Sequence, residues 1–475
     1  MITSQLVFIP APGAGHLPPT VELAKLLLHR HQHLSVTILI MITVEPKHTT
    51  ETPNPTHDPR LRFIDIPCHE ESTNNLNTPK TFVTGFIQDQ KPHVRNIVRG
   101  LITSSSVPLV GLVVDMFCVP MIDLANEFGA PTYIYFTSNA GVLGLILHLQ
   151  AKHDEEDYDV TKLKDSELEL SVPSYVNPIP AKVLPTELLD KEGGSETFMD
   201  LARRFRESKG IIINTFKELE SHGVDSFSSC SKANIPPVFP VGPILNLKQK
   251  NNNKTNDTDE ILRWLNEQPE SSVVFLCFGS MGCFDQEQVE EIAVAVERSG
   301  QRFLWSLRRP PPKETMGHPK EYEDLEEVLP EGFLHRTSNV GKVIGWAPQM
   351  AVLSHPSVGG FVSHCGWNSI LESIWCGVPV AAWPIYAEQQ MNAFELVVEL
   401  GMAAEIRMDY RTNMRAGGSQ MIVTAEEIEN GIRRLMSDGE MRNKVKEMKE
   451  KSRLAISEGG SSYISIQRFI HHVML

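Results

Sequence analysis

Three stretches of the chain combine residue types that can carry out chemistry, and the first is "PAPGAGH" at residues 10–16. Gly13 and Gly15 let the backbone pass close to a ligand, and His16 follows them at the end of the apolar run "QLVFIP". A histidine can act as a base near neutral pH, although a capping or packing role fits this position equally well. The two glycines also resemble the start of a dinucleotide fingerprint, but its third glycine is missing and Pro18 and Pro19 occupy the expected helix start.

The second candidate is Asp115, an acidic residue that ends the apolar run "LVGLVV". An aspartate at this place can simply cap the helix that follows. If the strands that lead to His16 and Asp115 are neighbours in a sheet, the carboxylate can also accept a hydrogen bond from one imidazole nitrogen. That bond would fix the tautomer of the ring and stabilise its protonated form, as in a catalytic triad. Together the two residues indicate a general base.

The third stretch is "FVSHCGWNSILES", which could hold a metal ion, an anion or nothing. His364 and Cys365 are metal-ligand types, but no paired spacing supplies the further ligands that a metal needs. The turn delivers four residues to the start of an expected helix: Gly366, Trp367, Asn368 and Ser369. Free backbone N–H groups and the helix dipole bind anions at such a place. A phosphate therefore suits this turn better than zinc, and Cys365 is expected to pack.

Other motifs for catalysis or metal binding are weak or missing. The acidic patterns "DYD" at 157–159 and "DTD" at 257–259 lie in polar segments, where a solvated charge run is the more common explanation. The sequence contains no Gly-x-Ser-x-Gly elbow, P-loop or His-Glu-x-x-His motif. A serine hydrolase, a P-loop ATPase and a zinc protease are therefore not favoured, and no metal site is predicted.

The elements that must position these residues alternate between strand and helix. In the first half, apolar runs rich in β-branched residues occur near residue 5 and at 34–42, 60–67, 109–117 and 130–137, with helical periodicity after the first and fourth. Continuous apolar strands that alternate with helices indicate a parallel sheet buried on both faces. The fold class is therefore α/β, and residues 1–240 are expected to form one doubly wound domain.

The same alternation restarts after a polar, Asn-rich segment. Residues 241–258 include "KQKNNNKTNDT" and have no periodicity, so we interpret them as a linker. Residues 259–460 are then expected to form a second doubly wound domain, facing the first across a cleft. In open α/β sheets, ligands bind beyond the carboxyl ends of the strands. The strand-to-helix loops that carry the three stretches are at these ends.

Composition limits the possible partners and the compartment. The 475 residues are too many for one compact core, and 44 basic against 59 acidic residues give a net charge of −15. Such a charge repels nucleic acids and anionic membranes, so neither is an expected partner. The seven cysteines are scattered, without a Cys-x-x-Cys pair, and neither a signal peptide nor a membrane span is visible. We expect a cytoplasmic protein.

A longer segment carries a family resemblance. Residues 346–389, "WAPQMAVLSHPSVGGFVSHCGWNSILESIWCGVPVAAWPIYAEQ", closely resemble the 44-residue signature of plant family-1 UDP-dependent glycosyltransferases. The stretches "PAPGAGH", "VVDMFC" and "CFGSMG" and the chain length are also similar to that family. Within it, the chain resembles most the branch that glucosylates flavonoids, other phenolics and some terpenoids. The resemblance implies the two-domain GT-B fold, with the acceptor bound mainly by the first domain and the sugar donor mainly by the second.

The resemblance also implies roles for single residues. Trp346 would stack on uracil while the backbone of Ala347 reads the base edge, and Gln349 and Glu372 would bond the ribose hydroxyls. The diphosphate would be held by Ser280, His364, Gly366, Trp367, Asn368 and Ser369. Further donor contacts are expected from Gly15, Thr137, Ser138, Tyr386, Glu388 and Gln389. A glutamine at the last of these positions is the family's usual mark of a glucose donor.

Placed together, these parts predict an inverting glucosyltransferase. Asp115 would hold His16, and His16 would take the proton of an acceptor hydroxyl as UDP leaves from the opposite face of the sugar. UDP-glucose would be the co-substrate, no cofactor or metal would be needed, and the protein is expected to be a monomer. Residues 461–475 would form a helix that crosses back to the first domain.

Two other functions and the acceptor remain open at this stage. An NAD(P)-dependent oxidoreductase would be built on the first half, but the missing third glycine and the absence of a placed acidic ribose ligand count against it. A non-catalytic nucleotide-sugar binder would more naturally lack the pair of His16 and Asp115. Acceptor-pocket candidates are Phe82, Phe86, Phe117 and Leu143, although apolar residues at these positions would serve equally well in a core.

Overall fold

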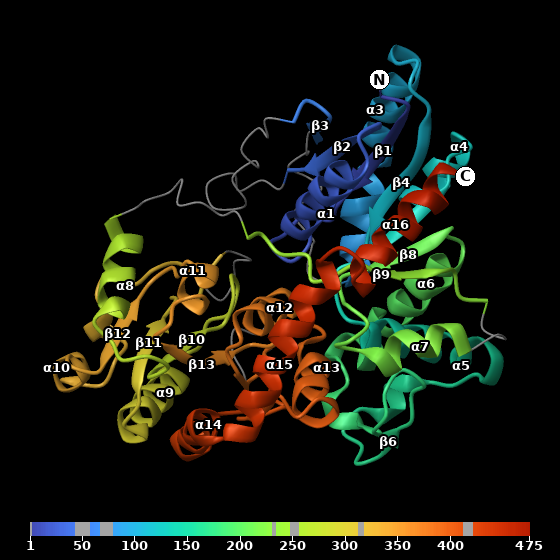
Figure 1. The fold of residues 1–475 in the computed structure, drawn as a ribbon. Coiled ribbons are helices and arrows are strands. Elements are labelled where there is room, and N and C mark those ends of the chain that lie inside the picture. The colour runs from blue at the N-terminus through green and yellow to red at the C-terminus, as the bar shows by residue number, and fades with distance from the viewer. Residues whose placement is uncertain are drawn as a thin grey trace. The chain divides into compact units, whose positions relative to one another are not determined.

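The computed structural model describes residues 2–42, 58–66, 79–229, 234–247, 256–311, 318–411 and 421–475. The chain divides into two compact units (Figure 1). The first consists of Met1–Pro178, Glu187–Asn246 and Leu454–Leu475, and the second of Ile179–Thr186 and Leu247–Arg453. Eight residues, Ile179–Thr186, therefore belong to the second unit although their neighbours in the chain on both sides belong to the first.

A parallel sheet of seven strands forms the centre of the first unit, in the order β3-β2-β1-β4-β5-β8-β9. Its first strands are almost wholly buried, because both faces are covered by helices. The strands are β1 (Ser4–Ile9), β2 (Leu34–Met41), β3 (Leu61–Ile66), β4 (Leu109–Asp115), β5 (Thr132–Phe136), β8 (Gly210–Ile213) and β9 (Val238–Pro240). The four strands expected from apolar runs after the first one are present, each within two residues of its predicted ends.

Among the residues that the structure describes, seven longer helices accompany this sheet: α1 (Leu17–Arg30), α3 (Lys91–Ser104), α4 (Met121–Glu127), α5 (Ala140–Glu156), α6 (Gly194–Arg206), α7 (Ser221–Ser229) and α16 (Ser461–Met474). The last of these, red in Figure 1, packs on β9, β4 and α1. Its Phe469 ring lies 5.2 Å from that of Tyr133 and 5.5 Å from that of Phe239. Short elements are α2 (Pro79–Thr81), the π-helical η2 (Phe82–Ile87), η3 (Val160–Leu163), β6 (Glu169–Leu170) and η5 (Thr186–Leu189).

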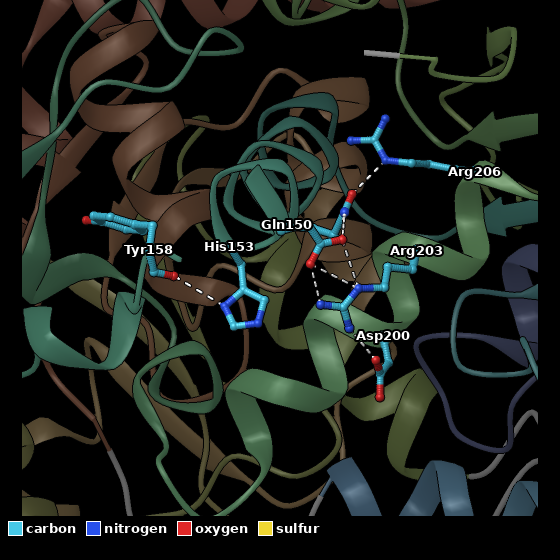
Figure 2. A network of polar contacts seen from close by, with 7 residues as sticks. Gln150, His153, Tyr158, Asp200, Arg203 and Arg206 are labelled. Carbon is cyan, nitrogen blue, oxygen red and sulfur yellow. Dashed lines mark hydrogen bonds and ion pairs between the residues drawn. The ribbon is translucent and has the colours of Figure 1, made fainter. Parts of the chain in front are cut away.

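Polar contacts hold α6 on α5, as Figure 2 shows. The Asp154 carboxylate accepts hydrogen bonds from the guanidinium of Arg203 and from the amide of Gln150. The Gln150 carbonyl oxygen in turn accepts one from Arg206 Nε, at 2.6 Å. The bonds from Arg203 lower the pKa of Asp154 to about 2. This network fixes the helix that carries Phe198, a residue considered below.

The second unit has a parallel sheet of six strands in the order β12-β11-β10-β13-β14-β15. They are β10 (Val273–Cys277), β11 (Arg302–Ser306), β12 (Gly341–Ile344), β13 (Val358–Ser363), β14 (Val380–Ala382) and β15 (Ala403–Glu405). The helices are α8 (Asn256–Asn266), α9 (Gln286–Ser299), α10 (Phe333–Thr337), α11 (Gln349–Leu353), α12 (Trp367–Cys376), α13 (Gln389–Phe394), α14 (Ala425–Ser437) and α15 (Gly439–Ile456). Shorter elements are β7 (Ile179–Pro180), η4 (Ala181–Val183), η6 (Leu325–Glu327) and the π-helical η7 (Glu395–Glu399).

Both sheets reverse their order at the same place. In the first unit the chain leaves β1, builds outward to β3 and returns to the other side of β1 with β4; in the second it does the same from β10 to β12 and back with β13. Each sheet therefore has a switch point, beside which ligands bind in doubly wound folds. The predicted class, two doubly wound parallel α/β units, is confirmed.

Two further sequence expectations concern segments between and outside the sheets. Of the expected linker, 241–258, residues 248–255 lie outside the described residues, and α8 already begins at Asn256. Among the helices that the structure describes, none combines the length and the apolar character needed to cross a bilayer.

Candidate active site

The first switch point brings His16 and Asp115 together. Because β1 and β4 pair in parallel, with Ile9 beside Val114, the loops that follow the two strands meet at the same sheet edge. Nδ1 of His16 lies 2.8 Å from Oδ2 of Asp115. The aspartate side chain is completely buried, whereas 23% of the histidine side chain is exposed. The pair thus has one end in the core and one end accessible.

The surroundings of the pair fix both side chains. The backbone N–H of Phe117 donates to Oδ1 of Asp115 at 3.0 Å, and Oγ1 of Thr137 lies 3.1 Å from His16 Nδ1. A neutral imidazole that carries its proton on Nδ1, where the carboxylate accepts it, has its lone pair on Nε2. Such a ring can take a proton from a hydroxyl group, and the buried carboxylate stabilises the imidazolium that forms.

The loop before His16 explains why the ring can serve this purpose. Gly13 has φ +124°, a conformation that side chains disfavour, and a Cβ at Gly15 would meet no atom of the described residues within 4 Å. His16 occupies the N-cap position of α1 but makes no side-chain cap, and prolines fill the first turn, where no N–H is needed. The capping role considered from the sequence is therefore not the one that the side chain has.

At the second switch point, His364 follows β13 in a very different environment. Burial lowers the pKa of its ring to about 4, so it is neutral at physiological pH. Gly279, with φ +75°, and Gly366 leave it room, since a Cβ at either position would come within 2.5 Å of Nε2. Its Nδ1 has no hydrogen-bond partner among the described residues. A buried, unsatisfied ring nitrogen is the kind of atom that a bound ligand satisfies.

The start of α12, where the sequence predicts an anion site, follows the turn that ends β13. Gly366 is the N-cap and provides no side-chain cap, and the first turn holds no acidic residue. Trp367 and Ser369 are buried and Asn368 is half-buried. Ser280 is half-buried just beyond β10, after the left-handed Gly279. Backbone N–H groups of an uncapped helix start attract an anion without a net positive charge.

Three of the predicted donor residues share a polar cluster. Nε2 of Gln349 donates to Ser369 Oγ at 2.9 Å and to Glu372 Oε2 at 2.7 Å. Burial raises the pKa of Glu372 to about 7, although the bond from Gln349 opposes the shift. These two hydrogen bonds from Gln349 connect the start of α11 to the first turns of α12.

Trp346 is held with its ring open to solvent. Trp346 is 58% exposed, whereas the next residue, Ala347, is buried. The backbone N–H of Trp346 donates to Glu321 Oε1 at 2.9 Å, and the guanidinium carbon of Arg308 lies 5.2 Å from the indole centroid. Sequence reasoning missed Arg308 and Glu321. Their segment has no periodicity, so only its charged residues beside a tryptophan could have drawn attention.

The remaining predicted donor residues lie near α13 and β5. Oε1 of Gln389 accepts hydrogen bonds from the backbone N–H groups of Ile385 and Tyr386, at 2.9 and 3.1 Å. Burial raises the pKa of Tyr386 to about 12, and Glu388 is the N-cap residue of α13. In the first unit, Thr137 and Ser138 are buried in the turn that leads from β5 to α5.

The four acceptor-pocket candidates separate into two kinds. Phe86 and Leu143 are fully buried, whereas Phe82 and Phe117 are half-buried. The Phe82 and Phe117 rings are 5.7 Å apart, and the Phe117 ring is 5.5 Å from that of His16. Phe198 of α6, which sequence reasoning missed, extends this aromatic cluster with its ring 6.5 Å from that of Phe117.

Neither acidic pattern forms a metal centre in the part of the chain that the structure describes. No group of three or more His, Cys, Asp or Glu residues there could hold a metal ion. Asp157 instead ends α5 with φ 52°, and Asp159 caps η3 by accepting from the N–H of Thr161. The pattern at 257–259 lies in the first turn of α8.

Comparisons with known proteins show which family the chain belongs to. The family model described as "UDP-glucoronosyl and UDP-glucosyl transferase" matches residues 234–445. UDP-glycosyltransferase 71E1 of Stevia rebaudiana is 70% identical over 475 residues, which are 100% of this chain and 99% of that protein. UDP-glucose flavonoid 3-O-glucosyltransferase 6 of Fragaria ananassa is 52% identical over 493 residues, covering 99% of this chain and 98% of that protein.

A solved structure gives the same result for the fold. Medicago truncatula UGT71G1, crystallised with UDP-glucose, is similar to this chain with a TM-score of 0.88 at 42% identity. The alignment covers 100% of this chain and 99% of that one.

Proposed function

Because the chain belongs to the plant UDP-glycosyltransferases, enzymes with the GT-B fold, we propose that it is an inverting glucosyltransferase that uses UDP-glucose. The acceptor is a small hydrophobic plant metabolite with a hydroxyl group, such as a flavonoid, another phenolic or a triterpenoid. The observation that carries the proposal is the 2.8 Å contact between His16 Nδ1 and Asp115 Oδ2 at the first switch point. The relatives' names support glucose and flavonoids, since one is a flavonoid 3-O-glucosyltransferase.

The proposed reaction is a single displacement. Nε2 of His16 takes the proton of the acceptor hydroxyl while the oxygen forms a bond to the anomeric carbon. The bond from that carbon to the diphosphate breaks, and its electron pair leaves with UDP, so an α-linked donor gives a β-glucoside. Asp115 orients the ring and balances the charge of the imidazolium. General-base catalysis of this kind contributes on the order of 10²–10⁴-fold to the rate.

The second unit is the proposed donor side. The start of α12 and the neutral His364 would hold the diphosphate; the ring's unsatisfied Nδ1 supports this role, because it needs a partner. A neutral histidine can donate its one N–H to a phosphate oxygen, and it lacks the acidic second proton of an imidazolium. Gln349 and Glu372 would bond the ribose, and the exposed indole of Trp346 would stack on uracil. Glu388 and Gln389 would contact the sugar, from a turn in which Gln389 accepts hydrogen bonds from the backbone of Ile385 and Tyr386.

The first unit is the proposed acceptor side. The half-buried rings of Phe82 and Phe117 adjoin His16, so a flat aromatic acceptor could stack beside the base with its hydroxyl toward Nε2. Phe86 would support the Phe82 ring, since it is fully buried and its ring is stacked 5.9 Å from that of Phe82; Leu143 is fully buried as well.

Replacement of His16 by alanine tests the proposal. Glucoside formation from UDP-glucose and a simple flavonol, followed by mass spectrometry in excess EDTA, should be strong for the wild-type protein. The His16→Ala variant should lose on the order of 10²–10⁴-fold of this rate. Undiminished turnover would show that His16 is not the base, and a strict need for added divalent metal would contradict the metal-independent reaction.

The two other functions considered from the sequence have separate tests. A thermal-shift screen should detect stabilisation by UDP and UDP-glucose and none by NAD, because binding to the folded state raises the melting temperature. A non-catalytic nucleotide-sugar binder would be stabilised by UDP but would give no glucoside.

A further inference from the structure

Glu220 is a buried carboxylate that the proposed reaction does not use. It lies in the stretch "NTFKELES", directly before α7, and the residue is only 4% exposed. Its Oε2 accepts a hydrogen bond from the backbone N–H of Ala140 at 3.0 Å, and its Oε1 accepts one from Gly141 at 2.9 Å. A side chain 80 residues further along the chain thus caps the first turn of α5 with both of its oxygens.

The start of α5 is fixed from several other directions as well. The side chain of Asn139 accepts from the N–H of Val142 at 2.6 Å, and the Ser174 hydroxyl donates to the carbonyl of Gly141 at 2.9 Å. A carboxylate at a helix N-terminus interacts favourably with the helix dipole and makes charge-assisted bonds to N–H groups. Burial raises the pKa of Glu220, and the hydrogen bonds from the Thr215 side chain and from the backbone of Ala140 and Gly141 oppose that shift.

This helix start is continuous with the turn that touches the proposed base. Thr137 lies only three residues before Ala140, and its Oγ1 is 3.1 Å from His16 Nδ1. The two residues between Thr137 and Ala140 are Ser138 and Asn139. Both are buried, so a movement of the helix start is expected to move Thr137 as well. The same ring nitrogen is also 2.8 Å from Asp115 Oδ2. A displacement of the first turn of α5 would therefore alter the contact between Thr137 Oγ1 and His16 Nδ1.

We propose that Glu220 is a positioning residue for His16: through the N–H groups of Ala140 and Gly141 it sets the turn at 137–139, and this turn places Thr137 against the imidazole. The proposal rests on the proposed function for its catalytic consequence. The geometry explains why the site needs a carboxylate. A glutamine of the same shape has one oxygen and one NH2 group, and that NH2 would face a backbone N–H where a bond is now accepted.

A double-mutant cycle in the full-length enzyme tests the proposal. The kcat for transfer from saturating UDP-glucose to a flavonol is measured for Glu220→Gln, Thr137→Val and the double variant. Each single change should lower kcat on the order of tenfold, and the double variant should be no slower than the slower single one. Losses that multiply, or a Glu220→Gln variant with wild-type kcat, would overturn the proposal.

Controls separate positioning from general stability. Glu218→Gln makes the same change two residues away at an exposed position, where the amide oxygen can still accept the hydrogen bond from Ser461 Oγ, and it should leave kcat unchanged. Glu220→Asp keeps a carboxylate and should recover part of the rate that Glu220→Gln loses. If Glu220→Asp were as slow as Glu220→Gln while both melt near the wild-type temperature, the carboxylate would not be the positioning group.

A measurement without substrate keeps the test independent of the proposed function. In protein with ¹⁵N-labelled histidine, the His16 ring signals are assigned by their loss in His16→Ala. Glu220→Gln and Thr137→Val should shift the Nδ1 signal of His16, whereas Glu218→Gln should not. Unchanged signals in Glu220→Gln would contradict the proposal, whether or not the protein forms a glucoside. Shifted signals in a protein without glucosyl transfer would uphold the positioning and reject only the proposed function.

Discussion

The two switch points of this molecule place the same type of residue in opposite environments. His16 follows β1 in the first unit and bonds to a fully buried carboxylate, with part of its ring exposed. His364 follows β13 in the second unit, where burial holds the ring neutral with a pKa of about 4. Two sheets with the same strand order thus present one histidine that can gain a proton and one that does not.

The difference shows that the neighbours of a histidine decide its chemistry. A carboxylate at 2.8 Å stabilises the imidazolium and orders the tautomer, so His16 suits proton transfer. At His364 the neighbours are Gly279 and Gly366, which leave space around Nε2 and add no charge. We infer that the first site is built for the chemical step and the second for binding a diphosphate.

The largest effect is expected when the carboxylate of the first site is neutralised. In Asp115→Asn the amide can donate its NH2 to Nδ1, which moves the ring proton to Nε2 and removes the lone pair needed for the base. We expect kcat to fall on the order of 10²-fold or more, with little change in UDP affinity, measured by initial rates and calorimetry. A wild-type rate in Asp115→Asn would show that the carboxylate of Asp115 is not what makes His16 a base.

A smaller effect is expected when the second site is crowded. In Gly366→Ala the new Cβ would come within 2.5 Å of His364 Nε2, although the backbone angles of Gly366 suit alanine. Moving the ring should weaken UDP binding by about tenfold, which corresponds to about 1.4 kcal/mol. Gly439→Ala is the matched control, since its Cβ would meet no atom of the described residues within 4 Å. Equal UDP affinities for the two variants would refute a binding role that depends on the position of His364.

The smallest effect concerns the stability cost of the buried carboxylate of Glu372, the proposed ribose ligand. The pKa of Glu372 is raised from 4.5 to about 7 in the folded protein, so between these values the folded chain holds a proton that the unfolded chain has lost. Stability should therefore fall as the pH rises from about 4.5 to about 7 and remain low above that. Glu372→Gln should remove this dependence, because the amide carries no charge that burial destabilises. At pH 8 the variant should be more stable than the wild type by about 1–2 kcal/mol, which is less than the full pKa shift would give because water screens part of the carboxylate.

Denaturant unfolding at pH 5 and pH 8 measures this effect. Glu447→Gln, an exposed change on α15, should alter stability by less than about 0.5 kcal/mol at either pH. The more stable Glu372→Gln variant should also bind UDP more weakly, because an amide accepts fewer bonds from ribose hydroxyls than a carboxylate does. If Glu372→Gln were less stable than the wild type at pH 8, the carboxylate would be a structural group.

Much of the scaffold was predictable from local patterns, because buried parallel strands are continuous apolar runs. The run before Asp115, for example, gave a strand that ends at that residue. Residues 179–186 show the limit: nothing in their sequence marks them as part of the second unit, because the bonds from Arg411 to the carbonyls of Lys182 and Leu184 join segments more than 200 residues apart.

The candidate site was predictable where strand ends define it. Parallel strands that are neighbours must bring their following loops together, so His16 and Asp115 could be paired from the sequence. Arg308 and Glu321, which hold Trp346, come from an irregular segment, and Glu220 reaches α5 from another part of the chain. Such contacts depend on tertiary packing and leave no periodic signal.

The division of labour between the two histidines is tested most directly by calorimetric titration of UDP into His16→Ala and His364→Ala. We predict that His16→Ala binds UDP with the wild-type dissociation constant, because its histidine lies outside the proposed donor site. His364→Ala should bind UDP at least about tenfold more weakly, since the diphosphate loses a hydrogen-bond donor. Wild-type UDP affinity in His364→Ala, or an equal loss in both variants, would contradict the account.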